Sequence, residues 1–269
     1  MQLNIENKVV VIVGSTRGLG RACASVFAEE GAKLALIARN GDELHAVSSR
    51  VKHVHGAAVK CFPGDMTAPE EAPRLIRAIE NHYGTVHALI NTIGVCNPNP
   101  NRDPLSSDLL WEESFQSTLM AAVRSCRSVI PIMQRNGGGA IVNTSAISVR
   151  HYSPAIAHYS AMKAAIAHFT KNLAIQYGKD NIRANILLPG WIMSEQVQEI
   201  YNQYANRDTL KGKSRAEIFH EMNEDAHRAT FGGRAGDPVE YARVAAFLCS
   251  DAASYVNGAW MNVDGGSMF

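Results

Sequence analysis

The stretch "KVVVIVGSTRGLG", Lys8–Gly20, decides the fold of this chain. Its first residues form a short β-branched run, which is typical of a strand that is buried on both faces. Glycines at positions 14, 18 and 20 follow directly, and apolar residues then recur with a helical period from Gly18 to Glu30. A strand, a glycine-rich turn and a helix in this order point the free N–H groups of the helix at the turn, where they attract an anion such as a pyrophosphate.

The rest of the chain alternates between strand-like and helix-like segments in the same way. We expect further strands at 32–38, 58–62, 87–91, 139–145, 182–188 and 260–266, and helices at 40–51, 69–83, 109–133 and 158–177. This alternation predicts an α/β fold with a single doubly wound, Rossmann-type parallel sheet and helices on both faces. We expect one domain over residues 1–269, in which the polar stretch 194–230 forms a small helical lid over a substrate pocket.

Composition narrows the possible partners and the cellular location. Hydrophobic residues make up 46% of the 269 positions and charged residues 19%, as in ordinary globular proteins with a large core. A formal net charge of +1 gives no electrostatic reason to expect nucleic acid or an anionic membrane as a partner. The five dispersed cysteines favour reduced thiols, and the start of the chain resembles neither a signal peptide nor a membrane span, so we expect a cytoplasmic protein.

No metal is expected. His53 and His55 alternate like a pair of ligands, but no further ligand lies at a suitable spacing, and a solvated segment is the simpler interpretation.

The glycine-rich turn is the first candidate binding site. Its spacing is G-x-x-x-G-x-G rather than the common G-x-G-x-x-G, yet its position between a strand and a helix favours a dinucleotide cofactor. The residues expected to contact that cofactor here are Gly14, Ser15, Thr16, Arg17, Gly18, Leu19 and Gly20.

The end of the second strand indicates which dinucleotide is bound. An acidic residue commonly stands there and binds the adenosine ribose hydroxyls, whereas this chain has Arg39. A guanidinium binds a 2′-phosphate with paired charge-assisted hydrogen bonds, and Arg17 supplies a second cation. The two arginines predict NADP(H); the alternative is that Arg39 is only a solvated turn residue. Asp42 and Glu43 lie close by, in the first turn of the next helix, where negative charge is favourable in any case.

The segment "AHYSAMKAAI", residues 157–166, holds the candidate catalytic pair. In a helix, Tyr159 and Lys163 lie one turn apart on the same face. A free phenol has a pKa of about 10, and an ammonium fixed beside it favours the phenolate and lowers that value toward neutrality. The pair is therefore either an exposed helix pair or a general acid/base whose pKa is adjusted by its neighbour.

Together these motifs resemble the short-chain dehydrogenase/reductase family of the single-domain type, from about Asn7 to Gly266. The similarity extends to the 3-oxoacyl-[acyl-carrier-protein] reductases, and it is strengthened by "LPGWIMS" at 188–194 and "VNGAWMNVDGG" at 256–266. The resemblance implies that Tyr159 is the general acid/base, that Lys163 is its neighbouring cation, and that the protein is a homotetramer or a homodimer. It also implies cofactor contacts for Asp65, Met66, Asn91, Gly94, Pro189, Gly190, Ile192, Ser194 and the catalytic pair itself, and substrate contacts for His151, Tyr152 and Trp191.

Two positions depart from the family pattern. The usual carbonyl-binding serine, thirteen residues before the tyrosine, is Ala146 here, so we take Ser145 as the catalytic and substrate-binding serine and keep Ser148 as an alternative. The usual asparagine of the long helix is Thr118. Loss of one carbonyl-polarising donor typically costs about 2.7–4 kcal/mol of transition-state stabilisation.

The leading hypothesis is an NADP(H)-dependent oxidoreductase that transfers hydride between the nicotinamide and a ketone or secondary alcohol. The alternatives are a 3-oxoacyl-thioester reductase, which acts on acyl-carrier or coenzyme-A substrates, and a catalytically silent NADP(H)-binding protein, which Ala146 and Thr118 suggest.

Overall fold

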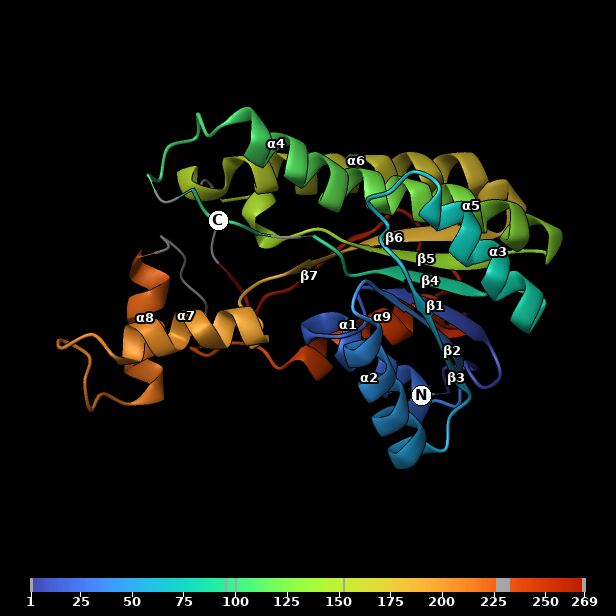
Figure 1. Cartoon of the computed structure of the whole chain (residues 1–269), viewed down its shortest axis with the longest axis horizontal. Coiled ribbons are helices and arrows are strands. Elements are labelled where there is room, and N and C mark those ends of the chain that lie inside the picture. The colour runs from blue at the N-terminus through green and yellow to red at the C-terminus, as the bar shows by residue number, and fades with distance from the viewer. Residues whose placement is uncertain (1, 95, 100, 152, 226–232, 268–269) are drawn as a thin grey trace.

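The computed structural model describes residues 2–94, 96–99, 101–151, 153–225 and 233–267, and it contains one parallel sheet with helices on both faces (Figure 1). The strands lie in the order β3-β2-β1-β4-β5-β6-β7, and each neighbouring pair runs parallel. Their bounds are β1 Val9–Val13, β2 Lys33–Ala38, β3 Val59–Pro63, β4 Ala88–Asn91, β5 Gly139–Thr144, β6 Ile182–Pro189 and β7 Trp260–Val263. The expected doubly wound, Rossmann-type fold is confirmed.

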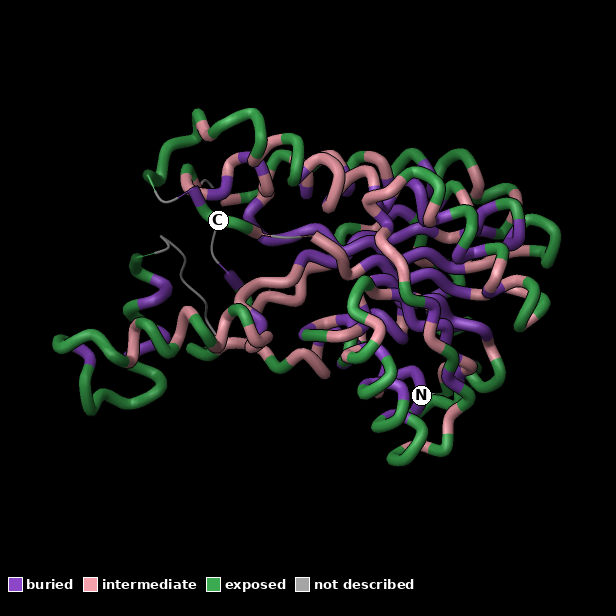
Figure 2. Tube along the Cα trace, in the orientation of Figure 1, coloured by how far each residue is buried: buried purple, intermediate pink, exposed green. Residues whose placement is uncertain are grey.

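Most of the helices form two layers with the sheet between them. Their bounds are α1 Gly18–Glu29, α2 Gly41–His55, α3 Glu71–Tyr83, α4 Asp108–Ser114, α5 Ala121–Arg135, α6 Ala157–Tyr177, α7 Glu195–Ala205, α8 Arg215–Asp225 and α9 Pro238–Cys249. Buried residues of α1, α2 and α9 form one apolar core against the sheet, and those of α3, α5 and α6 form a second core on its other face. Figure 2 shows this burial as a continuous interior along the strands, with exposed residues on the outer surfaces of the helices.

The sheet order reverses between β1 and β4, which locates the functional crevice. All five residues of β1 are buried, and β1 pairs with β2 on one side and with β4 on the other. The chain therefore leaves the carboxyl ends of β1 and β4 in opposite directions, and a crevice opens between their loops.

The long helix expected at 109–133 is not a single α-helix. A π-helical segment, Phe115–Met120, separates α4 from α5, and Thr118 lies within it and is fully buried. Such segments are rare and are found frequently at functional sites. The structure also contains α9, which was not expected from the sequence. Its signal is a capping box, in which Asp237 and Glu240 flank a proline at the first helical position.

Helices α7 and α8 project beyond the carboxyl ends of the strands (Figure 1). They share a small apolar cluster of their own, formed by Trp191, Val197, Ile200, Tyr201, Tyr204, Ala205, Leu210, Ile218, Phe219, Met222 and Ala235. The expected helical insertion is therefore present as far as Asp225, and residues 226–232 lie outside the described part. Across the residues that the structure describes, no helix combines the length and apolarity that crossing a membrane requires.

Candidate active site and cofactor cleft

A cleft of about 350 Å³ opens at the crevice between β1 and β4. Of the residues expected to bind a cofactor, it is lined by Gly14, Thr16, Arg17, Arg39, Asp65, Met66 and Gly94. These come from separate segments that follow β1, β2, β3 and β4, so the fold brings together positions that are far apart in the sequence. Lining residues that the sequence analysis did not assign to cofactor binding include Asn40, Glu43, Thr67 and Ser117.

The glycine-rich turn is closely packed between β1 and α1. A Cβ at Gly20 would lie 2.2 Å from the Gly14 carbonyl oxygen, so no side chain fits there. Gly14 itself has a φ of +85°, a conformation that glycine adopts without strain. The Ser15 side chain is fully buried and donates a hydrogen bond to the Ile37 carbonyl. Ser15 therefore holds the turn against β2 through its side chain.

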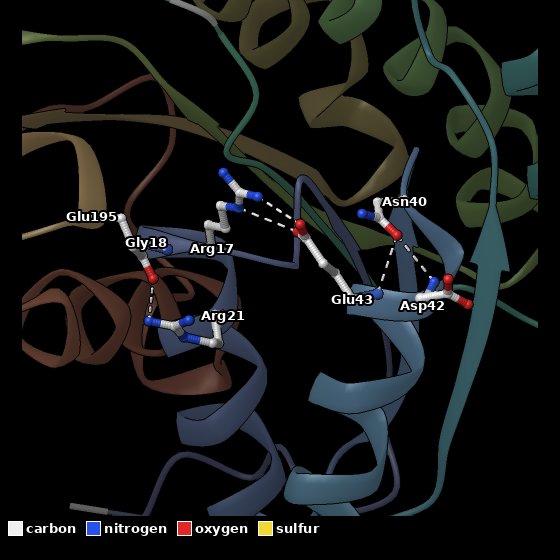
Figure 3. A network of polar contacts seen from close by, with 7 residues as sticks. All are labelled: Arg17, Gly18, Arg21, Asn40, Asp42, Glu43 and Glu195. Carbon is white, nitrogen blue, oxygen red and sulfur yellow. Dashed lines mark hydrogen bonds and ion pairs between the residues drawn. The ribbon is translucent and has the colours of Figure 1, made fainter.

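Protein carboxylates contact the cationic groups of the turn (Figure 3). Nε and Nη2 of Arg17 donate to the two carboxylate oxygens of Glu43, at 3.2 and 2.5 Å. The first helical N–H, that of Gly18, donates to Glu195 Oε2 at 2.9 Å, and Arg21 forms an ion pair with the same carboxylate. Arg39, by contrast, is exposed and takes part in no ion pair within the described residues.

The far wall of the cleft follows β3. Asp65 Oδ1 accepts hydrogen bonds from the backbone N–H and the hydroxyl of Thr67, at 2.9 and 2.8 Å. Met66 is buried beside it and adds apolar surface to the lining. A polar atom next to an apolar surface suits the edge and the face of an adenine ring; the resemblance implies an adenine contact for Asp65 and a cofactor contact for Met66.

The candidate catalytic pair lies on α6, at the carboxyl edge of the sheet. The sequence positions the two side chains through helical spacing, and Lys163 Nζ lies 5.4 Å from the centroid of the Tyr159 ring. Lys163 is 2% exposed, and its ammonium donates to the Ile93 carbonyl at 3.1 Å and to the Thr144 carbonyl at 2.8 Å. The ammonium is thus hydrogen-bonded to the backbone just after β4 and at the end of β5, and these bonds fix its position relative to the phenol.

Gly94 connects this pair with the cofactor cleft. It lines the cleft, and a Cβ at this position would lie 2.8 Å from Lys163 Nζ and 3.4 Å from Thr118 Oγ1. Its φ of +143° also favours glycine. The buried Thr118 hydroxyl has no hydrogen-bond partner among the described residues. A polar group without a partner is costly in the interior, so this one fits a bound water or ligand beside the ammonium.

Burial lowers the pKa of the Lys163 ammonium from its usual value to about 7. Burial acts in this direction because removal from water disfavours the charged form, whereas the two carbonyl acceptors and a nearby phenolate favour it. The charge on Lys163 is therefore sensitive to its surroundings near neutral pH. A group with this property is suited to assist a proton transfer at Tyr159.

Two serines were candidates for the carbonyl-polarising group, and the structure separates them. The Ser145 side chain is fully buried and donates to the Lys163 carbonyl at 2.8 Å. This bond uses its only proton, so Ser145 does not polarise a substrate, and that prediction is corrected: its side chain fastens α6 to β5. Ser148, in the one-turn 3₁₀ helix Ile147–Val149 between β5 and α6, is buried, and its hydroxyl has no hydrogen-bond partner in the described part of the chain.

Asn91, which the resemblance assigns to cofactor binding, has a side chain whose hydrogen bonds lie within the protein. Asn91 Nδ2 donates to Asn143 at 2.8 Å, and its Oδ1 accepts from Ser125 at 2.8 Å. Asn143 continues the chain of hydrogen bonds to Thr170 on α6. The side chain therefore lies in a buried polar network that joins β4, β5, α5 and α6, because buried amides need complete hydrogen bonding.

The segment after β6 lies between β7 and the glycine-rich turn. Pro189 ends β6, and the Gly190 N–H donates to the Val263 carbonyl of β7 at 3.0 Å. Ile192 is buried and bridges to Gly236. Ser194 caps α7 and lies against the glycine turn, since a Cβ at Gly18 would be 3.2 Å from Ser194 Cβ.

The first residues of α7 form hydrogen bonds to both sides of the crevice. Glu195 binds the turn after β1, and the next residue, Gln196, donates to the Cys96 carbonyl after β4 at 2.9 Å. Of the residues expected to bind substrate, His151 lies in the loop between β5 and α6, Trp191 packs against the apolar cluster of α7 and α8, and Tyr152 lies outside the described residues. Within the described ranges, no three His, Cys, Asp or Glu side chains are grouped so that they could hold a metal ion.

Comparisons with known proteins match this architecture over nearly the whole chain. The family model described as enoyl-(acyl carrier protein) reductase matches residues 13–268. The uncharacterised oxidoreductase YxbG of Bacillus subtilis is 32% identical over 98% of this chain and 92% of its own length. The 3-oxoacyl-[acyl-carrier-protein] reductase FabG of Chlamydia trachomatis is 30% identical over 97% of this chain and 98% of its own length.

A solved structure shows the same arrangement in three dimensions. L-sorbose reductase from Gluconobacter frateurii, complexed with NADPH and L-sorbose, superposes with a TM-score of 0.89 at 32% identity, covering 99% of this chain and 98% of that one. The matched family model, the two relatives and this structure cover nearly the whole chain. The chain therefore belongs to the short-chain dehydrogenase/reductase family of oxidoreductases.

Proposed function

We propose that this protein is an NADP(H)-dependent oxidoreductase that interconverts a ketone and a secondary alcohol, with Tyr159 as its general acid/base. The observation that carries the proposal is the position of Lys163: its buried ammonium lies 5.4 Å from the Tyr159 ring centroid and touches the glycine that lines the cofactor cleft. An exposed helix pair, the simpler alternative, would leave the lysine in solvent.

The residues present fit the cofactor. Two arginines line the cleft, and no acidic residue stands at the end of β2. The helix N–H that would bind a phosphate already binds an anionic group, a carboxylate of the protein. Arg17 and Arg39 would hold the 2′-phosphate, Asp65 and Met66 the adenine, and the glycine turn with Ser194 the pyrophosphate. The L-sorbose reductase complexed with NADPH supports the same choice of cofactor.

The chain's own residues account for the proton transfer. In reduction, the Tyr159 hydroxyl donates its proton to the substrate oxygen, and the Lys163 ammonium stabilises the phenolate that remains. In oxidation, the phenolate takes the proton from the alcohol. Ser148 donates a hydrogen bond to the substrate oxygen, the role for which Ser145 has no free proton. When bound, the nicotinamide supplies or accepts the hydride.

Turnover assays with a matched tyrosine variant test this proposal. Purified protein should oxidise NADPH with members of a panel of ketones, and Tyr159→Phe should lower kcat about 10²- to 10⁴-fold, because the general acid is lost. Tyr177→Phe makes the same change at the far end of α6, where the ring packs against the core, and should retain kcat. Full turnover by Tyr159→Phe would refute the mechanism.

Two alternatives are outcomes of the same assays. Turnover of 3-oxoacyl thioesters but of no simple ketone would identify a thioester reductase, which the similarity to FabG favours. Tight NADPH binding without any turnover would identify a silent binding protein, for which Ala146 and Thr118 are the argument.

We also propose a cytoplasmic homotetramer in which α7 and α8 serve as the substrate lid. Large exposed apolar side chains support an assembly: Leu105 before α4 is 87% exposed, Leu109 on α4 is 67% exposed, Ile175 on α6 is 74% exposed, and Trp260 on β7 is 41% exposed. Light scattering coupled to size-exclusion chromatography tests the assembly, and a monomeric mass would refute it.

A further inference from the structure

Two carboxylates of the chain bind groups of the protein that would hold the phosphates of the proposed cofactor (Figure 3). Glu195 accepts the Gly18 N–H at 2.9 Å and pairs with Arg21. Gly18 opens α1, so this N–H lies at the positive end of the helix dipole, where an anion is favoured. The carboxylate thus occupies the position expected for the pyrophosphate.

Glu43 has the corresponding position at the adenosine end. It accepts two hydrogen bonds from Arg17, and both residues line the cleft together with Arg39 and Asn40. The Asn40 side chain accepts the backbone N–H groups of Asp42 and Glu43, which fixes the first turn of α2 and with it the start of the Glu43 side chain. Arg17 is thereby turned toward a protein carboxylate instead of a ligand, while Arg39 has no acidic partner within the described part.

Both carboxylates are ionised near neutral pH. The hydrogen bond from Arg17 is the main cause that holds the pKa of Glu43 below its usual value. Burial acts to raise the pKa of Glu195, but its backbone hydrogen bonds and the charge of Arg21 outweigh burial and lower it. A dianionic or trianionic ligand that approaches these groups meets two negative charges, and a phosphate cannot share the same N–H and guanidinium with a carboxylate.

We propose that Glu43 and Glu195 are internal competitors of the cofactor phosphates, each displaced when NADP(H) binds, and that they thereby set its affinity and selectivity. This inference rests on the proposed cofactor. Glu195 opposes the pyrophosphate, which NADPH and NADH have in common. Glu43 opposes the 2′-phosphate, which only NADPH carries. The two residues therefore have separable effects: Glu195 lowers the affinity for both nucleotides, and Glu43 lowers the preference for NADPH.

Binding measurements with two nucleotides and matched glutamine variants test the proposal. Dissociation constants of NADPH and NADH are measured by titration calorimetry, without any need for turnover. Glu195→Gln should tighten both nucleotides by the same factor, about 5- to 30-fold for a partly buried charge at a helix N-terminus. Glu43→Gln should tighten NADPH about two- to fivefold, as for an exposed ion pair, and leave NADH unchanged. The double variant should show the product of the two factors for NADPH.

Glu199→Gln is the control. It removes the same charge from an exposed position one turn further along α7, near enough to act on Arg17 only through space. It should change neither constant more than about twofold. Unchanged or weaker binding of both nucleotides to Glu195→Gln, or weaker NADPH binding to Glu43→Gln, would overturn the inference.

These outcomes are distinct from a failure of the proposed function. If the dissociation constants followed the expected pattern but the protein showed no turnover, the catalytic proposal would be refuted. The proposal that Glu43 and Glu195 compete with the cofactor phosphates would be supported. If none of the five proteins bound either nucleotide, both proposals would be overturned.

Discussion

The catalytic half and the phosphate-binding half of the cleft hold their charges in opposite ways. Around Lys163 a single ammonium is 2% exposed, and backbone carbonyls of β4 and β5 accept its hydrogen bonds. Around the glycine turn, by contrast, side chains pair with side chains, and those of Arg17 and Glu43 are 67% and 34% exposed. The catalytic half is therefore fixed by the sheet, whereas the phosphate-binding half can exchange one anion for another.

The difference predicts how strongly each half responds to substitution. Exposed ion pairs contribute about 0–1 kcal/mol, because water screens them and mobile side chains lose entropy when they pair. Polar groups that are buried and directed at a reacting atom contribute about 2.7–4 kcal/mol to transition-state stabilisation. Substitutions near Lys163 should therefore change rates by orders of magnitude, whereas those at the phosphate end should mainly change the affinity for the cofactor.

The largest expected effect separates the two serines of the catalytic half. Ser148→Ala removes the proposed donor to the substrate oxygen and should lower kcat about 10²- to 10³-fold with little change in the dissociation constant of NADPH. Ser145→Ala removes a buried hydrogen bond within the protein and should lower the free energy of unfolding by about 1 kcal/mol, with a smaller loss of kcat. Steady-state kinetics and urea unfolding measure the two effects. A greater loss of kcat in Ser145→Ala than in Ser148→Ala would reverse the assignment.

A smaller effect is expected at the phosphate end. Arg39 has no acidic partner in the described residues, so its guanidinium is available for a 2′-phosphate without first breaking an ion pair. Arg39→Ala should weaken NADPH about 10- to 100-fold, as expected for the loss of hydrogen bonds between charged groups, and should leave NADH nearly unchanged.

Arg50→Ala provides the matched control for this charge. It removes an arginine from an exposed position on α2 outside the cleft, and it should leave both dissociation constants unchanged. Equal weakening of NADPH and NADH by Arg39→Ala would show that Arg39 supports the cleft as a whole and does not read the 2′-phosphate.

Local patterns in the sequence were sufficient to predict the fold and to select many of the candidate residues that the structure brings together at the cleft. The strand, turn and helix at Lys8–Gly20 are adjacent in the chain, and Tyr159 and Lys163 are related by helical spacing alone, so neither depends on distant contacts. The position of Arg39 at the cleft follows from its place at the end of β2. Because β2 pairs in parallel with β1, the carboxyl ends of both strands lie at the same edge of the sheet.

Other features depend on contacts that no local pattern contains. Glu195 meets Gly18 across 177 positions, and the direction of the Ser145 hydroxyl depends on how α6 packs on β5. The side chain of Asn91 is held in the core by partners on β5 and α5, and neither contact follows from the local pattern around β4. The sequence does not reveal the π-helical segment that contains Thr118, because the period of apolar residues does not distinguish it from an α-helix.

The smallest expected effect lies at the opposite edge of the sheet, where a half-buried group should affect stability and not catalysis. His87 Nδ1 accepts the Val9 N–H at 2.8 Å, which only the ring without a proton on Nδ1 can do. Burial, reinforced by the charges of Lys8 and Lys33, lowers the pKa of His87 below its usual value of 6.5. The unfolded chain therefore binds more protons than the folded protein between pH 6.5 and the lowered pKa. The free energy of unfolding should decrease as the pH falls through this window and level off below it.

Urea unfolding between pH 8 and pH 5 measures this effect, and His87→Asn isolates it. The asparagine oxygen can still accept the Val9 N–H but does not titrate, so the variant should show a flatter pH dependence than the wild type while kcat at pH 7.5 stays the same. The same slope in both proteins would assign the acid sensitivity to other groups. A loss of kcat would show that the amino edge of the sheet is coupled to the catalytic half of the cleft. The buried, apolar strand β1 connects the two regions.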